Sequence, residues 1–179
     1  MTFFKFNGKS RTIPSTHLYP LFTQEALRQI PNNKLTFLRG LPRSGKSTFA
    51  KEWLKQEKSR AIVCGDDFRL AIHGPTQYIR LAEPHVFASI FTAIRALLMK
   101  HEVLFDETNS SENSIRCIFE IDPAAEYVEF GTPPEVRFQR MIEKYKNEHS
   151  TLTCENVINN ITHQLETTDV EKIRREYIN

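Results

Sequence analysis

Short apolar runs alternate along this chain with longer segments in which apolar residues recur every three or four positions. The short runs have the length and composition of buried strands: Leu35–Leu38, Ala61–Cys64, Val103–Phe105 and Tyr127–Phe130. The longer segments are typical of amphipathic helices: Lys46–Glu57, Glu83–Lys100, Thr132 to about Lys146, and Thr151–Leu165. This alternation predicts an α/β fold with a parallel sheet that is covered by helices on both faces.

The amino-terminal part of the chain lacks this pattern. Prolines at positions 14, 20 and 31 stand there among aromatic residues with little periodicity. The full length of 179 residues corresponds to about one domain. We therefore expect an N-terminal extension at residues 1–33 and a single domain at residues 34–179.

The composition is that of a folded globular chain, with 40% hydrophobic and 26% charged residues. The 24 Lys and Arg residues nearly balance the 22 Asp and Glu residues, so the net charge of +2 excludes a histone-like polycation but not a local basic groove. Three widely spaced cysteines make neither a disulfide framework nor a zinc pair, and no apolar run approaches the roughly 18 residues of a membrane span. We expect a cytoplasmic protein without a membrane partner.

One motif indicates nucleotide binding. Residues 40–47, Gly-Leu-Pro-Arg-Ser-Gly-Lys-Ser, fit the phosphate-binding pattern G-x-x-x-x-G-K-[ST] between a predicted strand and a predicted helix. The two glycines allow successive N–H groups to converge on phosphates, the lysine reaches the β- and γ-phosphates, and the serine hydroxyl binds Mg²⁺. The predicted nucleotide-binding residues are Gly40, Leu41, Pro42, Arg43, Ser44, Gly45, Lys46, Ser47 and Thr48.

The remainder of the sequence favours a kinase within the P-loop class. About 130 residues follow the motif, which is short for a motor or an AAA+ core but suits small-molecule and nucleic-acid kinases. No N-K-x-D signal for guanine recognition is present, which disfavours a GTPase. ATP and Mg²⁺ are therefore the predicted cofactors.

Acidic residues follow two further predicted strands, at the sheet edge where ligands gather in parallel sheets. After the second strand, a carboxylate of Asp66 or Asp67 would accept the proton of an attacking hydroxyl, and Arg69 would bind an acceptor phosphate through two hydrogen bonds. A solvated loop with an aspartate cap is the alternative interpretation. After the third strand, Asp106 is predicted to lie near Mg²⁺, whereas Asn109 either joins the site or caps the next helix.

Basic residues share one face of the helix that is predicted to begin near Thr132. Arg137, Arg140 and Lys144 have the spacing i, i+3 and i+7. A movable helix with that face would close over the transferring phosphoryl group. A solvated basic face is the alternative interpretation.

Taken in order, these clusters resemble the 5′-OH polynucleotide kinase family over about Leu35 to Tyr145. The resemblance implies an adenylate-kinase-like P-loop fold with about five parallel strands, flanking helices and a lid helix. It also implies that Asp66 is the general base, that Arg69 binds the phosphate next to the acceptor hydroxyl, and that Arg140 contacts the β- and γ-phosphates. The segment 106–109 is similar to a D-x-T-N element, although its alignment is ambiguous by one residue between Asp106 and Glu107, and Lys144 stands where some members carry a second lid arginine.

We therefore predict an ATP- and Mg²⁺-dependent kinase that phosphorylates a 5′-hydroxyl end of DNA or RNA. In this prediction the residues divide into catalytic Lys46, Asp66 and Arg140; metal-binding Ser47 and Asp106; and substrate-binding Asp66, Asp67, Arg69, Thr108, Asn109 and Arg137.

Three alternatives remain open at this point. The first is a phage-type kinase that phosphorylates 5-hydroxymethyluracil in DNA, and the second is a small-metabolite or nucleoside kinase of the zeta-toxin or gluconate-kinase type. The third is a nucleotide-binding switch module that is not an enzyme. A small acceptor requires a closed pocket, whereas a strand end requires an open basic channel. The candidate channel residues are Lys9, Arg11, Arg69, His73, Arg80 and Arg116.

Overall fold

The structure, a computed structural model, describes residues 2–6, 9–13, 33–74, 79–131, 133, 136, 139–140 and 151–178, and divides the chain into two compact units. The first unit, Met1–Ile30, contains the antiparallel strands β1 (Thr2–Phe6) and β2 (Lys9–Ile13), in which Phe4 pairs with Arg11. The second unit, Pro31–Asn179, contains the α/β fold.

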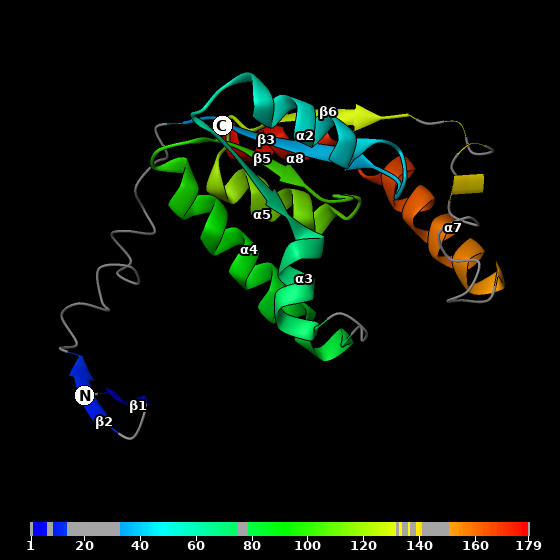
Figure 1. The fold of residues 1–179 in the computed structure, drawn as a ribbon. Coiled ribbons are helices and arrows are strands. Elements are labelled where there is room, and N and C mark those ends of the chain that lie inside the picture. The colour runs from blue at the N-terminus through cyan, green and yellow to red at the C-terminus, as the bar shows by residue number, and fades with distance from the viewer. Residues whose placement is uncertain are drawn as a thin grey trace. The chain divides into compact units, whose positions relative to one another are not determined.

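Four parallel strands form the sheet of the second unit, in the order β4-β5-β3-β6 (Figure 1). Their bounds are β3 (Leu35–Gly40), β4 (Arg60–Cys64), β5 (Glu102–Asp106) and β6 (Glu126–Phe130). All four predicted strands are present, and the α/β P-loop class is confirmed. The register pairs Cys64 with Asp106 and Gly40 with Phe130, so the segments that follow β3, β4 and β5 all begin at one edge of the sheet.

Helices cover the two faces of the sheet unequally in the part that the structure describes. Helix α2 (Lys46–Gln56) lies on one face, where Ala50 packs with Leu38 and Leu104. The other face carries α4 (Glu83–Leu98), α5 (Glu112–Ile121) and α8 (Val170–Ile178) (Figure 1). The larger core cluster lies on this second face, because alternate strand residues such as Phe37 and Phe105 point to it and are fully buried. The described residues of the unit also form α3 (Gly65–His73), the 3₁₀ turn η3 (Arg80–Ala82) and α7 (Thr151–Thr167).

Helix α8 closes the core at the carboxyl end of the chain. Val170 and Ile173 are buried within the larger core cluster, and the ring of Tyr177 lies 6.1 Å from that of Phe119. These buried side chains make α8 part of the domain core.

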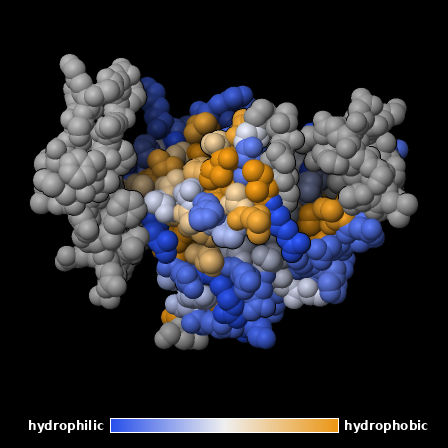
Figure 2. Space-filling model, turned by 90° about the horizontal axis from the view of Figure 1, so that it is seen from below, coloured by the Kyte–Doolittle hydropathy of each residue, from blue (hydrophilic) through white to orange (hydrophobic). Residues whose placement is uncertain are grey.

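Helix α4 is the most apolar helix of the described residues. Together with η3 it forms the one described helix, Arg80–Leu98, that is long and apolar enough to cross a membrane by length and composition. One face of α4, formed by Val86, Ile90, Ile94 and Leu98, is buried in the larger core cluster with residues of β3, β4 and β5. Figure 2 shows the side that faces down in Figure 1, where apolar residues lie among hydrophilic ones.

Candidate active site

The phosphate-binding loop follows β3 as the motif predicts. Gly40 has a φ of 146°, and a Cβ placed on it would lie 2.9 Å from both the Cβ and the carbonyl oxygen of Phe130. Gly45 has a φ of 102° and precedes the first residue of α2. Glycine is therefore needed at the first position for space and at both for backbone conformation. The loop ends at the positive N-terminus of α2, which favours anions.

Lys46 is buried at the start of α2. Its ammonium group donates hydrogen bonds to the carbonyl oxygens of Gly40 (2.9 Å) and Leu41 (2.8 Å). Burial lowers the pKa of Lys46, while the carboxylates of Asp106, Glu107 and Asp66 act in the opposite direction. The P-loop cation is thus surrounded by acidic residues from two other loops.

Ser47 and Asp106 meet beside this lysine. The Ser47 hydroxyl lies close enough to the Asp106 carboxylate to affect its pKa, and Asp106 is buried at the end of β5. Burial raises the pKa of Asp106, whereas the Ser47 hydroxyl and the Lys46 charge lower it. A hydroxyl and a carboxylate next to a phosphate-binding loop are oxygen ligands of the kind that Mg²⁺ takes alongside substrate phosphates and water. No group of three or more His, Cys, Asp or Glu residues that suits a metal occurs in the described ranges.

The opposite side of the site is formed by the first turn of α3. This helix begins at Gly65 and therefore places Asp66 and Asp67 in its first turn. The side chain of Asp66 is 86% exposed, and Asp67 is exposed as well. Both carboxylates lie close enough to Asp106 to raise its pKa. The predicted acceptor-side acids and the P-loop therefore belong to one site.

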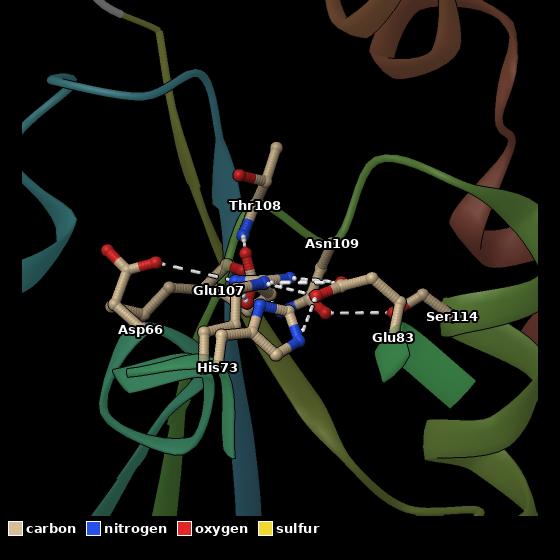
Figure 3. A network of polar contacts seen from close by, with 9 residues as sticks. Asp66, His73, Glu83, Glu107, Thr108, Asn109 and Ser114 are labelled. Carbon is tan, nitrogen blue, oxygen red and sulfur yellow. Dashed lines mark hydrogen bonds and ion pairs between the residues drawn. The ribbon is translucent and has the colours of Figure 1, made fainter. Parts of the chain in front are cut away.

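Arg69 contacts three carboxylates, those of Asp66 on α3 itself, Glu83 on α4 and Glu107 after β5. Figure 3 labels these three acids. Arg69 Nη1 donates to Glu107 Oε2 (2.8 Å) and to Asp66 Oδ1 (3.4 Å). Its Nε and Nη2 both donate to Glu83, with distances of 3.2 Å. The charges of Glu107 and Glu83 outweigh the burial of Arg69 and raise its pKa. The guanidinium, which we predicted to bind acceptor phosphate, is thus engaged with acids of the protein.

Sequence reasoning missed Glu83 and Glu107 as members of this site. Glu83 is the first residue of α4 and carries no motif, so no sequence signal pointed to it. Glu107 had one signal, its ambiguous alignment with Asp106. The two residues have different places: Asp106 lies beside Ser47, while Glu107 bonds Arg69 and accepts a hydrogen bond from its neighbouring backbone N–H at Thr108 (3.0 Å).

Thr108 and Asn109, which follow Glu107, hydrogen-bond the end of β3 and the start of the P-loop. The Gly40 N–H donates to the carbonyl oxygen of Thr108 (3.2 Å), which ties this loop to the P-loop. Asn109 is only 2% exposed; its amide donates to Leu38 O (2.8 Å), and its oxygen accepts from Ser114 Oγ (3.0 Å). Its φ of 45° is one that Asn tolerates better than most residues. The geometry thus gives the Asn109 side chain protein partners instead of an exposed position for substrate.

The predicted capping role of Asn109 is also corrected by the structure. The residue that caps α5 is Ser111, whose side chain accepts a hydrogen bond from the N–H of Ser114 (3.3 Å). Asn109 instead holds the end of β3 through a contact 71 positions away in the sequence.

The predicted lid is described in part. Arg140 is exposed and helical, and its Nη1 donates to the carbonyl oxygen of the P-loop residue Arg43 (3.2 Å). Arg43 itself is exposed with a φ of 66°. Arg137 and Lys144 lie outside the described residues. Arg140 is therefore at the rim of the phosphate-binding loop, where the sequence predicted a lid arginine.

Arg39, next to the P-loop on β3, joins the site to the end of α7. This buried guanidinium contacts Glu129 on β6 (2.5 Å) and donates to the carbonyl oxygens of Leu165 (2.5 Å) and Thr168 (3.1 Å). Thr168 in turn donates to the carbonyl oxygen of Ser110 (3.0 Å). The strand before the P-loop and the loop after β5 thus share one anchor at the end of α7.

Two of the candidate channel residues have acidic partners within the second unit: Arg116 pairs with Glu112 and Glu176, and Arg69 pairs with Glu83 and Glu107. Lys9 and Arg11 belong to the first unit. A cavity of about 270 Å³ in the second unit is lined by residues such as Lys34 and Glu102, at the amino ends of the strands. This cavity therefore lies at the other end of the sheet from Lys46 and Asp66.

Comparison with protein families identifies the chain. The AAA_33 family model, described as an AAA domain, matches residues 35–168. The chain belongs to this AAA domain family. The matched range begins with β3 and includes every site residue described above. The length of the chain had favoured a kinase over an AAA+ core. The solved structures below have a similar fold.

Three solved structures illustrate the similarity. A chain in the structure of the Pnkp1/Rnl/Hen1 RNA repair complex has 27% sequence identity and a TM-score of 0.61, over 77% of this chain and 47% of that chain. The Mycobacterium tuberculosis APS kinase CysC in complex with AMPPNP and APS has 18% identity and a TM-score of 0.52. The match covers 69% of this chain and 76% of that chain. A gluconokinase from Sinorhizobium meliloti 1021 has 15% identity and a TM-score of 0.51. The match covers 84% of this chain and 91% of that chain.

These comparisons establish an α/β P-loop fold for the chain. The two small-molecule kinases are so distant in sequence that they show the fold alone. The chain spans about half the length of the repair-complex chain that it matches. No curated protein sequence gave a significant match.

Proposed function

We propose that this protein is an ATP- and Mg²⁺-dependent phosphotransferase that acts on a 5′-hydroxyl end of DNA or RNA. The observation that carries the proposal is the position of the Asp66–Arg69 pair. A P-loop alone needs no acidic residue on its acceptor side, yet an exposed carboxylate with a neighbouring arginine faces the same sheet edge as Lys46 and Asp106. This arrangement suits activation of a hydroxyl that lies next to a phosphate.

Each group of residues has a distinct task in this proposal. The P-loop N–H groups and Lys46 hold the phosphates of ATP, and Arg140 neutralises charge from the rim of the loop. Asp66 accepts the proton of the acceptor hydroxyl as that oxygen attacks the γ-phosphorus and the bond to ADP breaks. Its 86% exposure leaves the carboxylate accessible to an acceptor. Asn109 positions the loop after β5 through Leu38, in place of the substrate contact expected from its motif.

The residues beside Lys46 fit Mg²⁺. Ser47 and Asp106 would hold it, because both offer oxygen atoms next to the phosphate-binding loop. When bound, Mg²⁺ supplies neutralisation of the β- and γ-phosphate charge. Asp106 is buried, and its carboxylate lies beside the Ser47 hydroxyl.

The similarity to a chain of an RNA repair complex supports a nucleic acid as the acceptor. The modified-base kinase remains the second candidate, because its acceptor is also a hydroxyl in a phosphate-rich strand and would use the same base. A small-metabolite kinase is a third candidate, and the acceptor panel below distinguishes it from the other two. Cytoplasmic location stays a prediction from the sequence.

Transfer of labelled γ-phosphate from ATP with Mg²⁺ to a panel of acceptors tests the proposal. The panel contains 5′-OH DNA, 5′-OH RNA, 5′-phosphorylated DNA with internal 5-hydroxymethyluracil, and a nucleoside mixture. Label on the 5′-OH strands alone supports the proposal and ranks DNA against RNA. Label on the end-blocked modified DNA moves the assignment to the base kinase, and label on nucleosides alone rejects a polynucleotide acceptor.

A binding measurement separates the enzyme from the switch module. If ATP binds with Mg²⁺ but no acceptor in the panel is labelled, the polynucleotide kinase proposal is wrong.

The exposed Glu120 on α5 provides a control for the transfer assay. Glu120→Gln removes one surface charge away from the site and should label acceptors as the natural protein does.

A further inference from the structure

Arg69 has almost no hydrogen-bonding capacity left for a substrate. A guanidinium carries five N–H donors, two of which form the edge made by Nε and Nη2. Both atoms of that edge donate to the carboxylate of Glu83, and Nη1 donates to Glu107 and Asp66. A ligand phosphate that binds Arg69 through two parallel bonds must therefore replace one of these carboxylates.

The two glutamates differ in how firmly they are held. Glu107 also accepts a hydrogen bond from the Thr108 N–H (3.0 Å), and its carboxylate lies tightly against the backbone of Gly65. Glu83 has a weaker second contact, 3.6 Å from its Oε1 to Nε2 of His73 (Figure 3). Its side chain is 16% exposed, and its backbone is fixed as the first residue of α4. Of the two carboxylates, Glu83 therefore has the weaker contact beyond Arg69, so it is the one that a ligand phosphate would replace at lower cost.

The geometry of Glu83 on Arg69 is that of a bound oxyanion. Its two oxygens lie at 3.2 Å from Nε, and Oε2 lies at 3.2 Å from Nη2. A phosphate group uses the same edge of an arginine with two of its oxygens. The protein thus places one of its own carboxylates where an acceptor phosphate would bind.

We propose that Glu83 is a specificity-determining residue that competes with the acceptor phosphate for Arg69. This inference rests on the proposed function. An acceptor with a phosphate correctly placed beside its hydroxyl displaces Glu83, and its binding is weakened by the cost of that exchange. An acceptor without such a phosphate leaves the Glu83–Arg69 pair intact, so Glu83 does not affect its binding.

The test is the acceptor dependence of Glu83→Gln, which removes the charge of the competitor and keeps its size. We expect the KM for a 5′-OH oligonucleotide to fall by about tenfold, the factor that corresponds to weakening one charge-assisted hydrogen bond by about 1.4 kcal/mol. The kcat, the KM for ATP and the KM for a nucleoside acceptor should stay unchanged. Glu83→Asp, which retains the charge, should give an oligonucleotide KM closer to that of the natural protein.

A matched control removes a glutamate from another arginine. Glu171 pairs with Arg174 at 3.0 Å on α8, far from the site in the sequence, and Glu171→Gln should leave every KM unchanged. An oligonucleotide KM that is unchanged or raised in Glu83→Gln overturns the inference, because Glu83 would then only hold Arg69 in place.

Failure of the proposed function can be recognised separately. If the natural protein labels no oligonucleotide, the polynucleotide kinase proposal fails, and binding of a 5′-phosphorylated oligonucleotide then decides the role of Glu83 without turnover. Tighter binding of that strand by Glu83→Gln than by the natural protein supports the competition. Equal or weaker binding rejects it.

Discussion

The carboxylate of Glu107 occupies the space into which a side chain at Gly65 would project. A Cβ on Gly65 would overlap Glu107 Oε2 and would lie 3.2 Å from Nη1 of Arg69. The φ of Gly65 is not in the left-handed region, so backbone conformation does not require glycine here. Glycine is needed because the Glu107 carboxylate lies close to the backbone. The start of α3 and the loop after β5 thus pack closely at the Glu107 side chain, which also bonds Arg69.

Gly65→Ala should impair the acceptor side of the site more than it destabilises the fold. The new methyl group displaces the flexible end of Glu107, which breaks its 2.8 Å contact with Arg69. We expect kcat/KM for the acceptor to fall by at least about tenfold, corresponding to the loss of a charge-assisted bond, with little change in melting temperature. Steady-state kinetics and thermal unfolding measure both.

Two variants make this prediction specific. Gly131→Ala adds a methyl group where no atom lies within 4 Å and should behave as the natural protein. Glu107→Asp in the Gly65→Ala background shortens the displaced side chain and should recover part of the activity. No recovery, with a collapsed melting temperature, would mean that Gly65 matters for folding and not for Arg69.

Asp66→Asn should abolish transfer while leaving nucleotide affinity nearly unchanged. A positioned general base contributes about 10²–10⁴-fold to rate, and the exposed Asp66 makes no contact that holds the phosphate-binding loop. Label transfer gives the rate, and titration with a fluorescent ATP analogue gives the affinity. Loss of nucleotide binding would contradict the assignment and point to a structural or metal role for Asp66.

Lys46→Met should abolish transfer but raise the melting temperature at neutral pH. Burial lowers the pKa of Lys46, so folding penalises its charged form. As pH rises through the lysine range, the folded protein loses this proton before the unfolded chain does, and the penalty disappears. The stability advantage of the variant should therefore be largest near neutral pH and should shrink in alkaline buffer. A melting temperature below that of the natural protein at neutral pH would show that the bonds from Lys46 to Gly40 and Leu41 outweigh its burial.

Arg39→Met should loosen the end of α7. The substitution removes charge-assisted bonds to the carbonyl oxygens of Leu165 and Thr168, each of a kind worth about 1.5–3 kcal/mol. We expect the free energy of unfolding to fall by about 2 kcal/mol or more, with faster amide exchange in the last turn of α7. Glu129→Gln is the matched control: it alters the half-exposed partner and should cost less than about 1 kcal/mol. Equal effects of the two variants would contradict the anchoring role of Arg39.

The strands and the phosphate-binding loop were predictable because their signals are local. Each strand is a short apolar run, and the loop from Gly40 to Ser47 is defined by its own spacing. The network around Arg69 could not be predicted, because the partners of Arg69 are distant in the sequence. Glu83 is 14 positions away and Glu107 is 38 positions away. The same reason explains Asn109, whose side chain is fixed by a backbone carbonyl of β3 that no local pattern indicates.

The packing of α8 determines how this protein should be shortened for further work. The family match ends at residue 168, but Val170 and Ile173 are buried in the main core cluster. A fragment trimmed to the matched range would expose the apolar surface of α5 that these residues cover, and would be prone to aggregate. Expression of the α/β unit alone should therefore retain the chain through Ile178, whose exposed side chain leaves that end accessible to an affinity tag.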